Sequence, residues 1–149
     1  MLTVALGSGA HAPRRRRLDL RGVVILIVED HDDSREMLRQ MVEAFGAATL
    51  TAADGRAALR LIGDVCPDLV FLDLVLPGMD GYEFIERLRE RKELARIPVI
   101  AVTALASGAD VMRTWEAGFN GHLVKPVTFD VVEAQLERVF WAHALTDAS

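Results

Sequence analysis

The polar residues that end the short apolar runs of this chain have the chemistry of a metal-dependent phosphoryl site. The acids Glu29-Asp30 and Asp73 follow such runs, and Thr103 and Lys125 end two others. Clustered carboxylates repel one another, so they favour a hard divalent cation with oxygen ligands, and we expect Mg²⁺. With that cation and the lysine ammonium neutralising an incoming phosphoryl group, one carboxylate can act as the nucleophile and form an aspartyl-phosphate.

The residues around these positions predict strands that alternate with helices from residue 22 onward. Uninterrupted aliphatic runs between turn signals are typical of strands buried on both faces of a parallel sheet. We expect strands over 23–28, 47–52, 68–73, 98–102 and 121–124. Helices with apolar residues at helical spacing should follow, the first capped by Asp32 or Asp33 and the others starting near Asp54, Gly81, Ser107 and Thr128. Because the carboxyl ends of parallel strands meet at the edge where ligands bind, the five polar residues should converge there.

Length, composition and charge predict one folded domain with a basic leader. The 149 residues are 51% hydrophobic and 26% charged, which is ordinary for a globular protein. Residues 1–22 carry five arginines and one acid, whereas acids predominate in the remainder. We expect a basic, disordered extension over 1–21, a folded domain over 22–142 and a short tail over 143–149. The single cysteine, Cys66, is typical of a protein in a reducing compartment. The sequence also shows no secretory signal and no apolar run long enough for a membrane helix. We therefore expect a cytoplasmic protein with no membrane partner.

Five segments, in their order and spacing, resemble the CheY-like receiver domain of two-component response regulators, the phosphorylation module of bacterial signalling. The segments are Ile27-Val28-Glu29-Asp30, Asp68-Leu69-Val70-Phe71-Leu72-Asp73, Leu76-Pro77-Gly78-Met79-Asp80-Gly81, Pro98-Val99-Ile100-Ala101-Val102-Thr103-Ala104 and Gly121-His122-Leu123-Val124-Lys125-Pro126. The resemblance covers nearly the whole domain, from about Val23 to Phe140. It implies an α/β fold of the flavodoxin-like, doubly wound (βα)5 type, with a five-stranded parallel sheet of order 2-1-3-4-5.

The resemblance also implies a role for each acid at the predicted site. Asp73 occupies the position of the phosphoacceptor. Asp30 and Asp73 would ligate Mg²⁺ together with the backbone carbonyl of Val75, and Glu29 would act mostly through water. The expected cofactor is therefore Mg²⁺, held by Glu29, Asp30, Asp73 and Val75.

The same resemblance assigns the residues that would hold the phosphoryl group and respond to it. Thr103 and the backbone N–H of Ala104 would hydrogen-bond its oxygens, and Lys125 would pair with them across a cis peptide to Pro126. Thr103 would act in a conformational switch with His122, where receivers usually carry Tyr or Phe. Histidine can change charge near neutral pH, which permits a pH-sensing role. We favour the interpretation that it is a tolerated variant on a half-exposed strand.

These assignments predict a single-domain response regulator. It would accept a phosphoryl group on Asp73 from a histidine kinase or a histidine phosphotransfer protein and then bind a downstream protein partner. It would thus be a phosphorylation-controlled binding module, not a conventional enzyme. A homodimer could form through the face built from the helix after Ser107, the strand 121–124 and the final helix. Trp115 and Trp141, at helical spacing, are expected to be packing residues and not a binding site.

Three other interpretations compete with this one. Haloacid-dehalogenase-like phosphatases also use a strand-end Asp, Mg²⁺, a Thr and a Lys, but they need a second acid where this chain has Val75. A DNA-associated regulator could use the arginine arm at 14–17, although no helix-turn-helix follows Phe140, so nucleic acid is not the expected partner. A degenerate receiver that never takes up a phosphoryl group is disfavoured by the complete set of acids, Thr and Lys.

Overall fold

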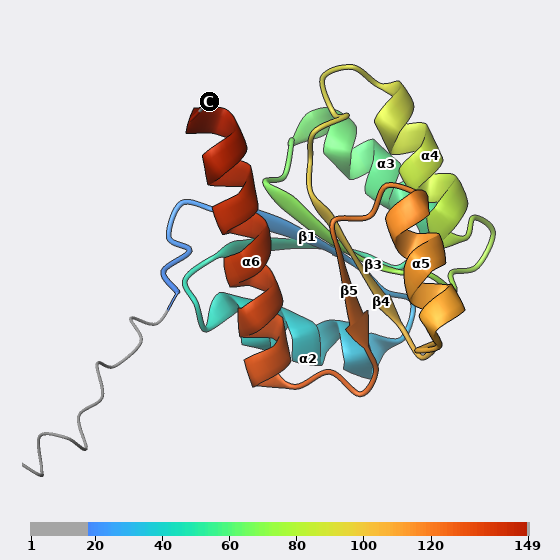
Figure 1. The fold of residues 1–149 in the computed structure, drawn as a ribbon, viewed down its shortest axis with the longest axis horizontal. Helices are drawn as coiled ribbons and strands as arrows, with labels where there is room; N and C mark the ends of the chain where they lie inside the picture. The colour runs from blue at the N-terminus through green and yellow to red at the C-terminus, as the bar shows by residue number, and fades with distance from the viewer. Residues whose placement is uncertain (1–17, 149) are drawn as a thin grey trace, which may run out of the picture.

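The computed structural model describes residues 18–148 as one parallel sheet with helices on both faces (Figure 1). The strands are β1 (Val24–Val28), β2 (Ala48–Ala52), β3 (Leu69–Asp73), β4 (Val99–Thr103) and β5 (Gly121–Val124), and their order in the sheet is β2-β1-β3-β4-β5. The helices are α2 (Asp32–Glu43), α3 (Gly55–Asp64), α4 (Gly81–Glu90), α5 (Gly108–Glu116) and α6 (Phe129–Ala148). All four strand pairs are parallel, which confirms the predicted flavodoxin-like fold.

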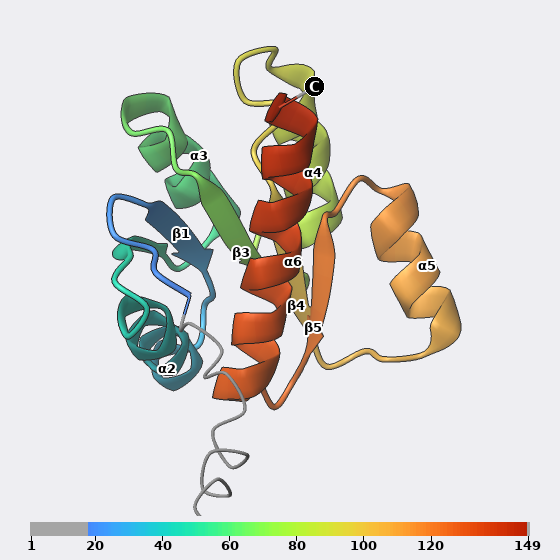
Figure 2. The same ribbon diagram turned by 60° about the vertical axis from the view of Figure 1, so that its left-hand side comes forward.

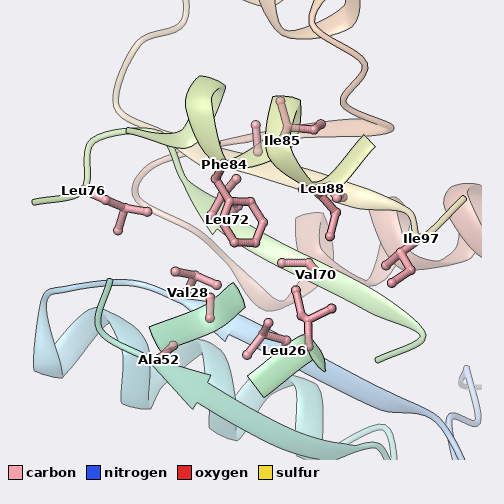
Figure 3. Packing of buried hydrophobic residues seen from close by; sticks show 14 of the residues in the cluster. Leu26, Val28, Ala52, Val70, Leu72, Leu76, Phe84, Ile85, Leu88 and Ile97 are labelled. Carbon is pink, nitrogen blue, oxygen red and sulfur yellow. The ribbon is translucent and has the colours of Figure 1, made fainter. Parts of the chain in front are cut away.

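The alternation of side chains along the strands creates two cores, one on each face of the sheet. Figure 2 shows the helices that cover these faces. On one face, Leu26 and Val28 of β1 pack with Val70 and Leu72 of β3 against α3 and α4. Figure 3 shows the strand residues beside Phe84, Ile85 and Leu88 of α4. On the other face, Ile25, Ile27, Leu69 and Phe71 pack with residues of α2 and α6. Because β1 and β3 are buried on both faces, their side chains are apolar until the carboxyl ends, where polar residues become possible.

Side-chain caps fix where three of the helices begin. Asp54, Asp80 and Ser107 each accept a hydrogen bond from a backbone N–H in the first turn of the helix that follows, and Ser107 forms a capping box with Asp110. The prediction that Asp32 or Asp33 caps α2 is wrong, because the N-cap is His31 and makes no capping hydrogen bond with its side chain. Asp32 and Asp33 lie inside the first turn, where their negative charges interact favourably with the positive end of the helix dipole.

The ends of the folded domain differ from the predicted boundaries. Residues 18–21 were expected to belong to a disordered extension, but Leu20 is 3% exposed within the α2–α6 core and its N–H donates to the Phe45 carbonyl at 2.7 Å. The arginine arm at 14–17 lies outside the described residues. At the other end, α6 continues to Ala148, so residues 143–148 are helical where we expected a tail. Neither α6 nor any other helix within 18–148 is long and apolar enough to cross a membrane.

The packing of Leu20 gives a test of where the domain begins. Leu20→Ala should lower the free energy of unfolding by about 2–3 kcal/mol, because it opens a cavity in the α2–α6 core. Urea denaturation of the full chain measures this loss. Arg21→Ala is the matched control, since Arg21 is exposed and pairs only with its neighbour Asp19, and it should change the midpoint little. Equal midpoints for Leu20→Ala and Arg21→Ala would contradict a structural role for this segment.

Candidate functional site

The structure brings the predicted polar residues to one edge of the sheet. Val28 of β1 lies opposite Leu72 of β3, so the residues that follow them, Glu29 and Asp73, are neighbours at the carboxyl ends. Glu29 is 4% exposed and Asp73 is 5% exposed, although both are acids. Thr103 is buried at the end of β4, and Lys125 follows β5. Four strands therefore contribute to the site, as predicted.

The three acids form a group that can hold a metal ion. Glu29, Asp30 and Asp73 each offer one carboxylate oxygen, and these oxygens all lie within 4.8 Å of one another. A donor set made only of oxygens suits a hard cation such as Mg²⁺. The Val75 N–H donates to Asp73 Oδ1 at 3.0 Å and thereby orients one carboxylate oxygen. The residues present thus fit the expected cofactor.

Lys125 holds the two buried acids together. Its Nζ donates to Glu29 Oε1 at 2.8 Å and to Asp73 Oδ2 at 2.9 Å. The Lys125–Pro126 peptide is cis, which confirms that expectation. Two carboxylates with little access to water would be costly side by side without a cation, and this ammonium offsets part of that cost. In the described part of the chain, no buried side-chain nitrogen or oxygen lacks a hydrogen-bond partner.

Burial and charge shift the pKa values of two groups at the site. Burial, together with the nearby Asp73 carboxylate, raises the pKa of Glu29, although hydrogen bonds from Lys125 and from the His31 N–H oppose this. Partial burial of Lys125 works to lower its pKa, but the hydrogen bonds to Glu29 and Asp73 outweigh burial, and the pKa lies above its ordinary value. The lysine is therefore a firmly charged partner, while burial makes Glu29 take up a proton more readily than an ordinary glutamate.

The loop after β4 carries the residues expected to hold a phosphoryl group. Thr103 Oγ1 accepts a hydrogen bond from the Leu105 N–H at 3.0 Å, and Ala104 is exposed. His122, at the expected switch position, lies between this loop and α5. Its Nδ1 is 3.1 Å from Thr114 Oγ1, and its Nε2 is 3.3 Å from the Leu105 carbonyl oxygen. His122 is thus connected through Leu105 to Thr103, and its role in a switch stays a prediction.

Sequence reasoning missed one residue that contacts the site. The Arg35 guanidinium in α2 donates through Nη1 to the Glu29 carbonyl oxygen at 3.0 Å. Arg35 stands among the charged residues of an amphipathic helix and has no motif of its own. The one available signal was its position, since the first turn of the helix after β1 must pass close to the carboxyl end of that strand.

Comparisons with known proteins identify the family of this domain. A sequence profile of the response regulator receiver domain matches residues 25–137. The polar-differentiation response regulator DivK of Brucella ovis is 36% identical over 104 residues, which are 70% of this chain and 85% of DivK. The chain therefore belongs to the response regulator receiver family of two-component signalling.

Solved structures agree with this assignment. The receiver domain of a signal transduction histidine kinase from Syntrophus aciditrophicus is 34% identical, with a TM-score of 0.73 over 80% of this chain and 91% of that domain. The receiver domain of a sensor histidine kinase from Pseudomonas aeruginosa is 31% identical, with a TM-score of 0.72. The match covers 78% of this chain and 95% of that domain. That domain has a magnesium ion coordinated in its active-site cleft.

The raised pKa of Glu29 predicts how the stability of the metal-free protein depends on pH. The folded protein keeps this proton at a pH where the unfolded chain has released it, so ionising Glu29 at higher pH destabilises the fold. Glu29→Gln keeps an oxygen acceptor for Lys125 but removes one of the clustered charges. At pH 7 it should raise the free energy of unfolding by on the order of 1 kcal/mol.

The difference between Glu29→Gln and wild type should shrink as the pH falls into the range where Glu29 is protonated. Urea midpoints measured in a chelator at several pH values test this. Glu86→Gln, on the exposed side of α4, is the control for loss of a negative charge. The same pH profile for both variants would show that burial of Glu29 has no such effect.

Proposed function

We propose that this chain is a phosphorylation-controlled binding module whose phosphoacceptor is Asp73. The donor is the phosphohistidine of a histidine kinase or of a histidine phosphotransfer protein. The observation that carries this proposal is the buried pair of acids with Lys125 bound to both of them, at 2.8 Å and 2.9 Å. Membership in the receiver family supports the same chemistry.

In the proposed reaction, a carboxylate oxygen of Asp73 attacks the phosphorus of the phosphohistidine. The new O–P bond forms as the P–N bond breaks, and the leaving imidazole takes up a proton. Glu29, Asp30, Asp73 and the Val75 carbonyl would hold Mg²⁺, which would draw negative charge from the phosphoryl oxygens. Lys125 supplies a positive charge beside the same oxygens, and the Thr103 hydroxyl and Ala104 N–H serve as donors.

A binding module is favoured over a phosphatase because the site has no second catalytic acid in the required place. The residue two positions after Asp73 is Val75, which is 71% exposed and cannot donate or accept a proton. Turnover of an external phosphate ester needs such a general acid and base. The aspartyl-phosphate therefore acts as a signal whose lifetime determines how long a partner is bound.

The first test is intact-mass spectrometry after incubation with acetyl phosphate and Mg²⁺. We expect a single phosphoryl adduct that requires Mg²⁺ and is lost completely in Asp73→Asn, because no other carboxylate replaces the nucleophile. Asp64→Asn is the matched control, since Asp64 is an exposed acid at the end of α3. No adduct in the wild type, or an adduct that persists in Asp73→Asn, would contradict the proposal.

The proposed output surface is the α5–β5–α6 face, defined by its exposed apolar side chains. The expectation that the two tryptophans are packed is wrong, because Trp115 is 45% exposed and Trp141 is 68% exposed. The Arg138 guanidinium of α6 lies 5.4 Å from the centroid of the Trp115 ring, so the two helices share one surface. Exposed apolar side chains on these elements and on the loop before α5 are Leu105, Met112, Trp115, Val124, Val131 and Trp141. Exposed apolar side chains, where they are contiguous, are typical of protein interaction sites.

We propose that this face binds a second copy of the chain after phosphorylation. Replacing Met112 by Ser and Trp115 by Ala together should weaken phosphorylation-dependent dimerisation at least tenfold, because both side chains project from α5 into solvent. Sedimentation velocity with and without acetyl phosphate measures the dimer. Val65→Ser, which changes an exposed apolar residue after α3, is the control. If the phosphorylated wild type stays monomeric, the dimer proposal is wrong, and the partner of this face would have to be a different protein.

A further inference from the structure

We propose that Arg35 is a positioning residue for the metal site, which holds the peptide between Glu29 and Asp30 in the orientation that presents both acids. The inference rests on the proposed function, because the acids are taken to bind Mg²⁺. It assigns a role to a residue of α2 that supplies no ligand to the metal. Arg35 acts on the backbone that carries two of the ligands.

The contacts of Arg35 fix its guanidinium at the end of β1. Nη1 donates to the Glu29 carbonyl oxygen at 3.0 Å, and Nη2 donates to Asp32 Oδ1 at 2.5 Å. The Arg35 side chain is only 23% exposed, whereas its partner Asp32 is 88% exposed. The Arg35 side chain is thus mostly buried, and its partner Asp32 lies on the solvent side of it. Asp32, which does not cap α2, instead holds the guanidinium in place.

Within the described residues, the Glu29 carbonyl of this peptide accepts no hydrogen bond from a neighbouring strand. The Glu29 N–H still donates to the Ala52 carbonyl of β2 at 3.0 Å, and the Glu29 carboxylate is held by Lys125 and by the His31 N–H. Beyond Val28 the paired register of β1 ends, so the carbonyl needs another donor. Arg35 is that donor, and its fork of N–H groups joins the carbonyl to Asp32.

Asp30 is the ligand most dependent on this arrangement. It is exposed, unlike Glu29 and Asp73, so tight packing does not fix its position. Its backbone nitrogen belongs to the peptide whose carbonyl Arg35 holds. If that peptide rotates, the Asp30 carboxylate moves relative to the other two acids, whose oxygens must stay close enough to share one cation. Groups that orient metal ligands in this way contribute substantially to metal affinity.

A positioning role and a simple charge effect predict opposite results. Arg35 is a cation near a site for a cation, so its charge alone opposes Mg²⁺ binding, and removing that charge would tighten binding. Loss of the hydrogen bond to Glu29 would instead weaken binding, because the acids would no longer be held in place. The sign of the change in affinity therefore distinguishes the two roles.

The experiment is an NMR titration of the full chain with Mg²⁺ alone, which follows the amides of Asp30, Asp73 and Val75. Arg35→Ala should weaken Mg²⁺ binding by about tenfold. Arg39→Ala is the matched control. It removes the same charge one turn further along α2, where Arg39 binds Glu36 and Glu43 and does not contact the site. Its affinity should equal that of the wild type or be slightly higher.

Further variants and conditions distinguish the loss of the Arg35 hydrogen bond from the loss of its charge and from a failure of the variant to fold. Arg35→Lys keeps the charge and one type of donor, and its affinity should lie between those of the wild type and Arg35→Ala. The loss in Arg35→Ala should persist at high salt, where charge effects are screened. Metal-free Arg35→Ala should also show faster amide exchange over residues 29–31. If the alanine variant does not fold, Arg35→Gln takes its place, with a weaker affinity than wild type expected.

An affinity of Arg35→Ala or Arg35→Gln that equals or exceeds that of the wild type would overturn the positioning role. Equal weakening in Arg39→Ala would overturn it as well, because the effect would then belong to the stability of α2 and not to the hydrogen bond of Arg35. Failure of the wild type to bind Mg²⁺ would overturn the proposed metal site itself. The failure of this inference and the failure of the proposed function therefore give different results.

Discussion

The structure at the carboxyl edge of the sheet depends on the contact of one ammonium group with two buried carboxylates. Glu29 and Asp73 end adjacent strands, and their side chains are almost completely removed from solvent. Two such acids repel each other strongly unless a cation lies between them. Lys125 supplies that cation from β5, which is separated from β3 by β4. The long lysine side chain reaches both acids, with Nζ at 2.8 Å from Glu29 Oε1 and 2.9 Å from Asp73 Oδ2.

The contact of Lys125 with the two acids would respond to the binding of a divalent cation or a phosphoryl group at the site. A divalent cation would compete with the Lys125 ammonium for the carboxylate oxygens, and the proposed phosphoryl group on Asp73 would give the ammonium new oxygens to bind. The acids are held close enough together to share one metal ion, although burial, together with the nearby Asp73 carboxylate, raises the pKa of Glu29. Packing alone would favour apolar residues at these buried positions. Their presence therefore reflects chemistry and not stability.

The fold and the composition of the site could be predicted from the sequence because both depend on local patterns. An apolar run buried on both faces is recognisable without its neighbours, and the parallel order then brings strand ends such as Asp73 and Thr103 together. The errors concern tertiary packing. Leu20 packs in the core with residues of α2 and α6, and nothing in the residues around it indicates that contact. Helical spacing could not show that Trp115 faces solvent, because its neighbour Thr114 takes the buried position.

Backbone hydrogen bonds at the ends of strands were also beyond prediction, and they link the site to the rest of the molecule. The Leu105 N–H donates to Thr103 Oγ1, and the Leu105 carbonyl oxygen lies 3.3 Å from His122 Nε2. If the Thr103 hydroxyl turned towards a phosphoryl oxygen, the Leu105 N–H would lose its acceptor. The loop would then shift relative to His122 and, through Thr114, relative to α5. His122, with contacts at both ring nitrogens, would thus connect the site to the α5–β5–α6 face from the position where Tyr or Phe was the usual expectation.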